Sequence, residues 1–245
     1  MKRILIAILL ATICQGADTD YKIYIVGETA RFDENKGKCL DMKGNLLYGK
    51  ADVRSVKDGW KIGTLCIDGE AIEERGYWYN GELYYIKPYK NGKFEGVAKF
   101  FYRSGRLEAE EPYKNGVKDG ITKGYYESGK LKYETPYKNG KAEGVDKAFY
   151  ESGKLKREAP FKNDYKDGIQ NFYYEDGKLK EEWTWKNRAL EGEKHFRKNG
   201  TISRIVTYEK GKAISGACYK TNGEKVPLTE AELENSRNGF NATCD

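Results

Sequence analysis

Carboxylates that could act as general acids or bases recur along this chain at a fixed interval. Glu110, Glu134, Glu158 and Glu182 stand 24 residues apart. An acidic catalytic pair needs two carboxylates whose surroundings push their pKa values apart. These four glutamates occupy equivalent positions in the repeat, so their surroundings should be alike and should not push their pKa values apart. The pattern therefore predicts cross-strand or surface partners and argues against a glycosidase-like acidic pair.

Other catalytic signatures lack support in the sequence. The chain has one histidine, His195, which lies in a divergent segment whose counterparts carry aromatic residues. We interpret it as a strand residue in place of Phe or Tyr. No nucleophile-elbow motif occurs, and each recurring glycine opens or closes a turn without preceding a helix, unlike a phosphate-binding loop. The sequence thus predicts a protein that is not an enzyme and has no cofactor.

The cysteines indicate disulfide chemistry. Cys39 and Cys66 precede the regular part of the sequence, and Cys218 and Cys244 follow it. No Cys-x-x-Cys or Cys/His cluster suggests a metal site. Four cysteines allow three pairings, and the clustering favours Cys39 with Cys66 and Cys218 with Cys244.

The N-terminus predicts export. Met1-Lys2-Arg3 is followed by the apolar run 4–13, as in a secretory signal peptide, and cleavage is expected near Ala17. Acylation of Cys14 is the weaker alternative, because the bulky Ile13 precedes it. Loss of residues 1–17 lowers the formal charge from +6 to +4. We expect a periplasmic or secreted protein, or one peripheral to the cell envelope, whose oxidising surroundings suit disulfides.

Glycines reveal an internal repeat. One series recurs every 24 residues, at Gly96, Gly120, Gly144, Gly168 and Gly192. A second runs through Gly81, Gly105, Gly129, Gly153 and Gly177. With 33% charged and 13% aromatic residues, the chain is too polar for a deep core and too aromatic for disorder. Tandem structural repeats explain both properties.

Each repeat reads as a β-hairpin. The run 97–102 is rich in β-branched and aromatic residues, 103–106 supplies a turn, and 107–114 forms a return strand. Asn-Gly at 91–92, 115–116 and 139–140 favours a tight turn into the next hairpin. The recurring prolines are expected at bulges or at positions that need no donor. We predict an all-β fold: an elongated, single-layer antiparallel sheet of tandem 24-residue hairpins.

The chain divides into five predicted parts. They are a signal peptide (1–17), an N-terminal segment (18–37), degenerate repeats (38–80), a regular repeat array (81–216) and a C-terminal cap (217–245). In the cap, Thr229 and Glu232 form a capping box and Gly239 is a stop signal, which predicts a short helix over 229–238. We expect this helix to cover the edge of the last strand.

The register assigns a role to each face of the sheet. If a four-residue turn pairs Tyr102 with Leu107, then Lys99 lies opposite Glu110. The same arithmetic pairs Lys123 with Glu134 and Lys147 with Glu158, giving one face a Lys/Glu ladder. The opposite face then carries a tyrosine-rich stripe. Its candidate binding residues are Tyr102, Tyr126, Tyr150, Tyr174, Tyr113 and Tyr137.

The repeat resembles a known family. Tyr-Tyr-Glu-Ser-Gly-Lys-Leu-Lys at 125–132, the segment 137–140 and the pairs 119–120 and 143–144 are similar to the MORN-repeat variant of the bacterial toxin–antitoxin system YwqK family antitoxin group. The resemblance covers about residues 38–216. It implies an open array of β-hairpins without catalytic residues, acting in protein binding, membrane association or toxin neutralisation.

The stripe has two readings. Aromatic side chains stacked on leucines would hold the repeats together, and a one-layer sheet would also leave part of the stripe for a partner. We expect an interaction scaffold for a protein partner, with an antitoxin-like role, or alternatively a peripheral binder of an anionic membrane surface. Lys and Glu are interspersed without a basic channel, which argues against a nucleic-acid partner.

Overall fold

The computed structural model describes residues 21–25, 30–33, 38–41, 50–57, 60–67, 70–78 and 80–235. The chain divides into two compact units, residues 1–81 with 89–92 and residues 82–88 with 93–245. We describe each unit by itself. The predicted signal peptide and Gly239 lie outside the described residues.

The first unit holds six strands of the described chain. They are β1 (Tyr21–Ile25), β2 (Ala30–Asp33), β3 (Lys38–Asp41), β4 (Lys50–Lys57), β5 (Trp60–Ile67) and β6 (Glu70–Tyr77). β4, β5 and β6 pair antiparallel in sequence order, and β2 pairs with β3. β1 pairs with β4 in parallel, an exception to the predicted antiparallel pairing. No strand was predicted for the segment 18–37, in which β1 and β2 lie.

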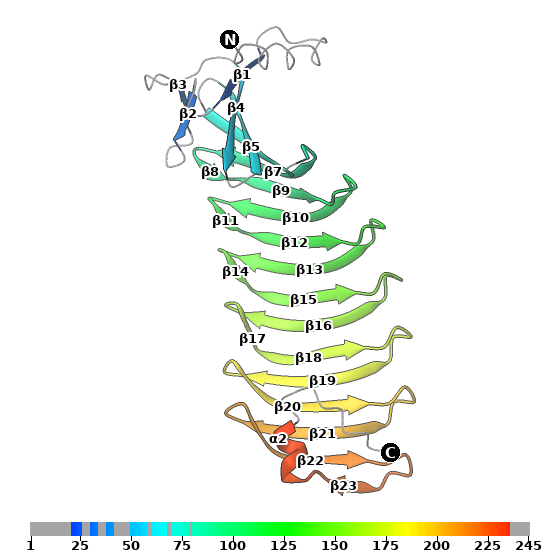
Figure 1. The fold of residues 1–245 in the computed structure, drawn as a ribbon. Helices are drawn as coiled ribbons and strands as arrows, with labels where there is room; N and C mark the ends of the chain where they lie inside the picture. The colour runs from blue at the N-terminus through cyan, green and yellow to red at the C-terminus, as the bar shows by residue number, and fades with distance from the viewer. Residues whose placement is uncertain are drawn as a thin grey trace. The chain divides into compact units, whose positions relative to one another are not determined.

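The second unit is an open antiparallel sheet of consecutive hairpins, as predicted (Figure 1). Its strands are β7 (Leu83–Lys90), β8 (Lys93–Phe94), β9 (Gly96–Phe101), β10 (Leu107–Lys114), β11 (Val117–Lys118), β12 (Gly120–Tyr125), β13 (Leu131–Lys138), β14 (Lys141–Ala142), β15 (Gly144–Phe149), β16 (Leu155–Lys162), β17 (Tyr165–Lys166), β18 (Gly168–Tyr173), β19 (Leu179–Lys186), β20 (Ala189–Phe196), β21 (Ile202–Glu209), β22 (Lys212–Tyr219) and β23 (Lys225–Pro227).

The Asn-Gly turns have the predicted conformation. Asn115 and Gly116 have φ of 52° and 87°, the left-handed pair that a type I′ hairpin turn requires. This turn joins β10 to the short β11, with Lys114 opposite Val117. The equivalent Asn139-Gly140 turn has φ of 51° and 83°.

Glycine and proline recur together because they touch. Gly120 has φ of 122°, and a Cβ there would lie 2.8 Å from Cγ of Pro112. The amide of Asp119 donates a 3.0 Å hydrogen bond to the Pro112 carbonyl beside this contact. Gly144 meets Pro136 in the same way, with a distance of 3.0 Å. The backbone can therefore approach the proline ring this closely only because glycine has no side chain.

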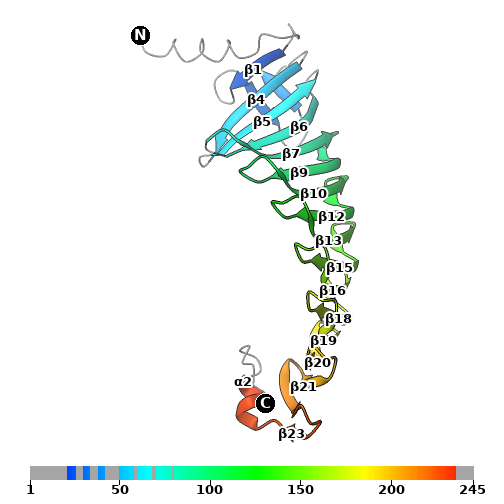
Figure 2. The ribbon, with the colours of Figure 1, turned by 90° about the vertical axis from the view of Figure 1, so that its right-hand side faces the viewer.

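The C-terminal helix forms, but it lies elsewhere than expected. α2 spans Glu230–Asn235, and its capping box is present: Glu232 accepts a 2.7 Å hydrogen bond from the Thr229 amide. Leu228 and Leu233 pack against Val206, Tyr208 and Ala213, on one face of the sheet (Figure 2). β23 occupies the strand position beside β22. The prediction that the helix covers the strand edge is therefore wrong, because its apolar side chains are buried on the face.

Candidate interaction surface

One face of the second unit carries the predicted charge ladder, and we call it the ladder face. Lys99 lies opposite Glu110, Lys123 opposite Glu134, and Lys147 opposite Glu158, as predicted. Between repeats, Glu110 also lies opposite Lys123. Residues directly opposite in antiparallel strands share a face, so this row continues across successive strands.

The predicted pairing of Tyr102 with Leu107, from which this register was derived, was wrong. Leu107 lies opposite Phe101, not Tyr102, and the register shifts between Leu107 and Ala109. This bulge adds one residue to β10, which restores the predicted pairing of Lys99 with Glu110. It also places Leu107 on the side of Phe101, away from the face of Tyr102.

Tyrosine hydroxyls fix the acids of the ladder. Tyr125 donates a 2.9 Å hydrogen bond to Glu110, and Tyr173 donates a 2.6 Å bond to Glu158. The bonds from Tyr173 and Asn171 lower the pKa of Glu158. Burial, together with the Glu158 carboxylate, raises the pKa of Tyr173 to about 12. Lys147 lies 3.5 Å from Glu134 in a partly exposed ion pair that contributes little stability.

An apolar row lies beside the ladder. Val97, Ile121, Val145 and Ile169 are each two residues before a ladder position, so they share the ladder face. Their exposed fractions are 46%, 52%, 45% and 50%. Three lie opposite a proline, at Pro112, Pro136 and Pro160. We call these four side chains the exposed row.

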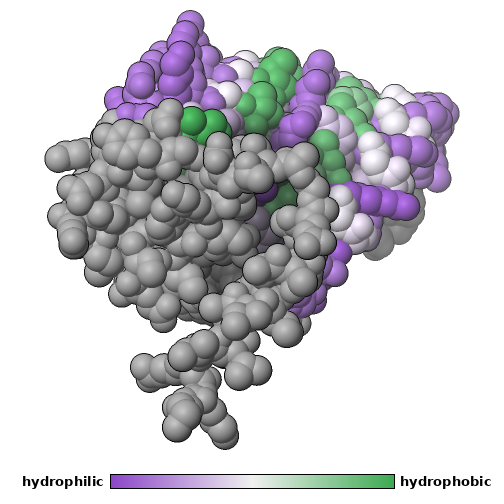
Figure 3. All heavy atoms as spheres, turned by 90° about the horizontal axis from the view of Figure 1, so that it is seen from above, coloured by the Kyte–Doolittle hydropathy of each residue, from purple (hydrophilic) through white to green (hydrophobic). Residues whose placement is uncertain are grey.

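The exposed row borders a shallow hollow. Val97, Pro112 and Ile121 line one side of a space of about 420 Å³. Lys99, Glu110 and Lys123 line the other. On the part of the described surface that is visible from above, hydrophobic residues alternate with hydrophilic ones (Figure 3). This arrangement offers apolar contact and both signs of charge within one depression.

Lysines that directly precede the asparagine of each tight turn flank the exposed row. Lys114, Lys138, Lys162 and Lys186 are all exposed, again at intervals of 24 residues. Carboxylates accompany them: Glu95 accepts a 2.7 Å hydrogen bond from the Asn115 amide, and Glu143 a 2.9 Å bond from Asn163. Positive and negative charges therefore alternate along this side too.

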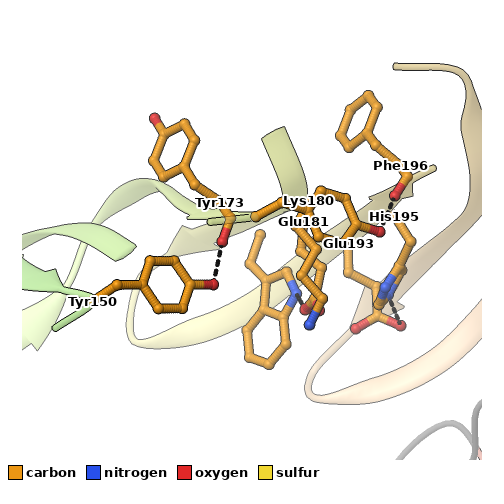
Figure 4. Close-up of polar contacts among 9 residues, drawn as sticks. Tyr150, Tyr173, Lys180, Glu181, Glu193, His195 and Phe196 are labelled. Atoms are coloured by element: carbon orange, nitrogen blue, oxygen red, sulfur yellow. Dashed lines mark hydrogen bonds and ion pairs between the residues drawn. The ribbon is translucent and has the colours of Figure 1, made fainter. Parts of the chain in front are cut away.

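The other face carries the tyrosines, and we call it the tyrosine face. Here each repeat bonds to the next through a tyrosine hydroxyl (Figure 4). Tyr150 donates a 2.6 Å hydrogen bond to the carbonyl of Tyr173. The equivalent bonds run from Tyr102 to Tyr125, from Tyr126 to Phe149 and from Tyr174 to Phe196, at 2.5, 2.7 and 2.8 Å.

Tyr113 and Tyr137 are also engaged. Tyr113 donates a 2.8 Å hydrogen bond to Glu111, and its ring lies 5.6 Å from that of Phe94. The ammonium of Lys118 lies 5.2 Å from the centre of the Tyr137 ring. The structure thus brings the six predicted tyrosines to the tyrosine face and gives each a contact within the repeat array. Their role in binding stays a prediction.

Buried charges on the tyrosine face are paired. Asp146 accepts hydrogen bonds from Thr135 and Arg157, and Glu193 accepts a 2.5 Å bond from Arg204. His195 lies in β20, with Nε2 3.4 Å from the same Glu193 carboxylate (Figure 4). Burial opposes ionisation of Glu193, yet His195 and Arg204 together lower its pKa. Asp146 and Glu193 thus form structural pairs with groups on neighbouring strands, and His195 lies beside Glu193 on the same strand.

The cysteines fall partly outside the described residues. Cys66 in β5 and Cys218 in β22 are buried. Cys244 and the side chain of Cys39 are not described, so both disulfide pairings stay predictions. Among the described residues, no three His, Cys, Asp or Glu side chains could hold a metal ion together. No described helix is long and apolar enough to cross a membrane.

The sequence prediction missed the exposed row. A signal was present, because each member directly follows a glycine of the first series: Gly96-Val97, Gly120-Ile121, Gly144-Val145 and Gly168-Ile169. We instead expected the tyrosine stripe to supply the exposed apolar surface. Within the described chain, however, the tyrosine face holds the buried side chains Ala98, Thr122, Asp146, Ala159 and Gln170.

Comparison with known proteins identifies the repeat. Residues 94–115, 118–139, 142–163 and 166–187 match the family described as MORN repeat variant. Comparison with curated proteins gave no match. Among solved structures, a chain of "Crystal Structure of TcdB2-TccC3-Cdc42" shares 12% identity and a TM-score of 0.21 over 81% of this chain. This protein spans 12% of the length of that chain.

Proposed function

We propose that this chain, which carries four tandem MORN repeat variant units, is a non-catalytic scaffold that binds another protein through the exposed row. MORN repeats often serve as protein or membrane interaction modules. The observation that carries this proposal is the periodic exposure of Val97, Ile121, Val145 and Ile169 on a one-layer sheet. Exposed apolar side chains in register form a surface that a partner can bury.

The spacing of the row favours a helical partner. Paired strands lie about 4.8 Å apart, so side chains two strands apart recur at about 10 Å. An α-helix rises about 1.5 Å per residue and presents one side chain per seven residues at about 10.5 Å. A helix lying along the row could therefore place one apolar residue of each heptad beside each repeat.

The charges favour a protein over a membrane. Lys99, Glu110 and Lys123 alternate along the ladder, and the turn lysines have carboxylates beside them. An anionic membrane attracts surfaces with excess positive charge. A protein helix with mixed charges flanking an apolar stripe complements both features.

The site of action follows from the N-terminal prediction. We propose that the chain is exported, since residues 1–13 have the pattern of a signal peptide. Neutralisation of a toxin-like partner is one form that such binding could take, and the resemblance of residues 38–216 to the antitoxin group supports it.

Loss of binding on substitution of the row tests the proposal. A protein captured by the wild-type chain would be identified, purified and titrated against an Ile121→Asn, Val145→Asn variant. We expect at least tenfold weaker binding. The matched control is Ile214→Asn, because Ile214 is also 52% exposed but lies outside the row. Equal affinity of both variants would contradict the proposal, and flotation with anionic vesicles would show whether a membrane is bound instead.

A further inference from the structure

A hollow on the tyrosine face breaks the repeat pattern. Its volume is about 220 Å³, below the range of about 300–1,000 Å³ that is usual for sites of drug-sized ligands. Five aromatic residues line it, namely Tyr84, Phe100, Tyr102, Tyr125 and Tyr133, together with the carboxylates of Glu108 and Glu111. A space of this size suits a small headgroup or one side chain.

A single glycine makes room for one wall of this hollow. A Cβ on Gly124 would lie 2.1 Å from Cε1 of Tyr133, so the tyrosine ring rests directly on the β12 backbone. In the flanking repeats the position of Gly124 holds Phe100, Ala148 and Phe172. The position of Tyr133 holds Ala109, Arg157 and Glu181. The aromatic wall therefore belongs to this repeat and is not a periodic feature.

The charge at the hollow is reversed relative to the following repeats. The ammonium of Lys132 lies 5.7 Å from the centre of the Tyr126 ring, and that of Lys156 lies 5.5 Å from Tyr150. Both lysines stand six residues after the tyrosine that they cover. Six residues after Tyr102 stands Glu108. Here the chain supplies a carboxylate in place of the ammonium.

The neighbouring charges leave Glu108 as the acidic group of the hollow. Glu111 is occupied, since Lys118 and Tyr113 donate hydrogen bonds of 2.6 and 2.8 Å to it. Lys132 also reaches the hollow, with its ammonium over Tyr126. Burial raises the pKa of Tyr133, and the carboxylates of Glu111 and Glu108 add to this, so both acids act on the aromatic wall.

We propose that this hollow binds an organic ammonium ion, such as the head of a lysine side chain, methylated or not, or a choline group. Aromatic faces attract such cations within about 6 Å of the ring centre. The ligand would take the place that a lysine of the chain itself occupies over Tyr126 and Tyr150. The site lies on the tyrosine face and does not depend on the proposed role of the exposed row.

Titration with matched small molecules tests this inference. The full chain would be titrated with choline and with 3,3-dimethyl-1-butanol, its uncharged analogue of the same shape, and followed by NMR of labelled tyrosines. We expect choline to shift the ring signals of Tyr102 and Tyr133 and to bind at least tenfold more tightly than the alcohol. Equal binding, or shifts elsewhere only, would overturn the proposal. Parallel titrations with acetylated lysine amide and its trimethyl form would distinguish a protein side chain from a choline headgroup.

A charge substitution at Glu108 provides a second test of the proposed ammonium site. Glu108→Lys introduces the residue that the next two repeats carry, so the fold should tolerate it, and its ammonium should cover Tyr102. We expect at least tenfold weaker choline binding. Glu151→Lys is the matched control, because Glu151 is an exposed acid in a turn away from the hollow. Undiminished binding by the Glu108→Lys variant would likewise overturn the assignment.

Discussion

The hydroxyl of Tyr150 donates a 2.6 Å hydrogen bond to the backbone carbonyl of Tyr173, one repeat further along the chain. The equivalent bonds from Tyr102, Tyr126 and Tyr174 make the same contact in successive repeats. In a repeat array, stability depends on the contacts between neighbours as well as on each unit. These tyrosines therefore couple the hairpins into one sheet.

Removal of one such hydroxyl should loosen one contact between repeats. For Tyr150→Phe we expect a loss of about 1 kcal/mol in the free energy of unfolding, because the hydrogen bond is lost and the carbonyl of Tyr173 is left without it. Urea unfolding followed by circular dichroism measures this loss. Tyr165→Phe is the control, since Tyr165 is 43% exposed at the start of the short strand β17. A cost equal to that of the control would show that the hydroxyl contributes nothing to coupling.

The contact between glycine and proline makes a comparison of two glycines informative. Gly129 and Gly120 both have positive φ, but a Cβ on Gly129 would meet nothing within 4 Å, whereas one on Gly120 would lie 2.8 Å from Pro112. We expect Gly129→Ala to cost about 1 kcal/mol from backbone strain alone. Gly120→Ala should cost at least about 2 kcal/mol, because the packing clash adds to the strain.

A double variant separates the two causes. Adding Pro112→Ala to Gly120→Ala removes the proline ring that the new methyl group would meet, so part of the loss should be recovered in urea unfolding. If the effects of Pro112→Ala and Gly120→Ala simply add, the close approach is not the reason for the glycine.

Alkaline pH should destabilise the fold through Tyr173. Its pKa is raised from 10.0 to about 12 by burial and by the hydrogen bond to Glu158. Above pH 10 the folded state therefore holds a proton that the unfolded state has lost. Stability from this group is present below pH 10 and should be lost as the pH rises from about 10 to 12. Thermal unfolding across this range should show a shallower decline for Tyr173→Phe, and an unchanged decline would contradict the assignment.

The capping box should hold the C-terminal helix. In the Thr229→Ala variant, the Glu232 carboxylate loses the hydrogen bond that the Thr229 hydroxyl donates to it. The Glu232 amide loses the hydroxyl oxygen that accepts its hydrogen bond and caps the helix. We expect the amides of α2 to exchange with solvent about fivefold faster, corresponding to about 1 kcal/mol. Thr221→Ala, in an exposed turn, serves as the control. Unchanged exchange in α2 would mean that packing of Leu233 alone keeps the helix in place.

Much of the fold follows from local chemistry that the sequence displays. Asn115-Gly116 encodes its turn through positive φ, and the pairing of Lys99 with Glu110 follows from alternation along the strands. The bulge beside Leu107 could not be predicted from the residue spacing. A hairpin without the bulge, in which Tyr102 pairs with Leu107, gives the same pairing of Lys99 with Glu110. The parallel pairing of β1 with β4 depends on contacts distant in sequence.

The assignment of faces needed the structure. Alternation separates residues such as Ile121 and Thr122 onto two faces, but it does not say which face is enclosed. Thr122 is 4% exposed and Ile121 is 52% exposed, the reverse of a simple rule based on polarity. Part of the tyrosine stripe was expected to be exposed because a one-layer sheet has no second layer to bury it, yet its tyrosines make a contact within the array once per repeat.

Photo-crosslinking from single positions tests the central claim most directly. A photoreactive amino acid would be placed in turn at Ile121, Val145 and Ile214 of the full chain in the cells that produce it. The account predicts one crosslinked partner protein, shared by positions 121 and 145, with little or none from position 214. Equal yields from all three positions, or crosslinks confined to position 214, would contradict the claim that the exposed row is the binding surface.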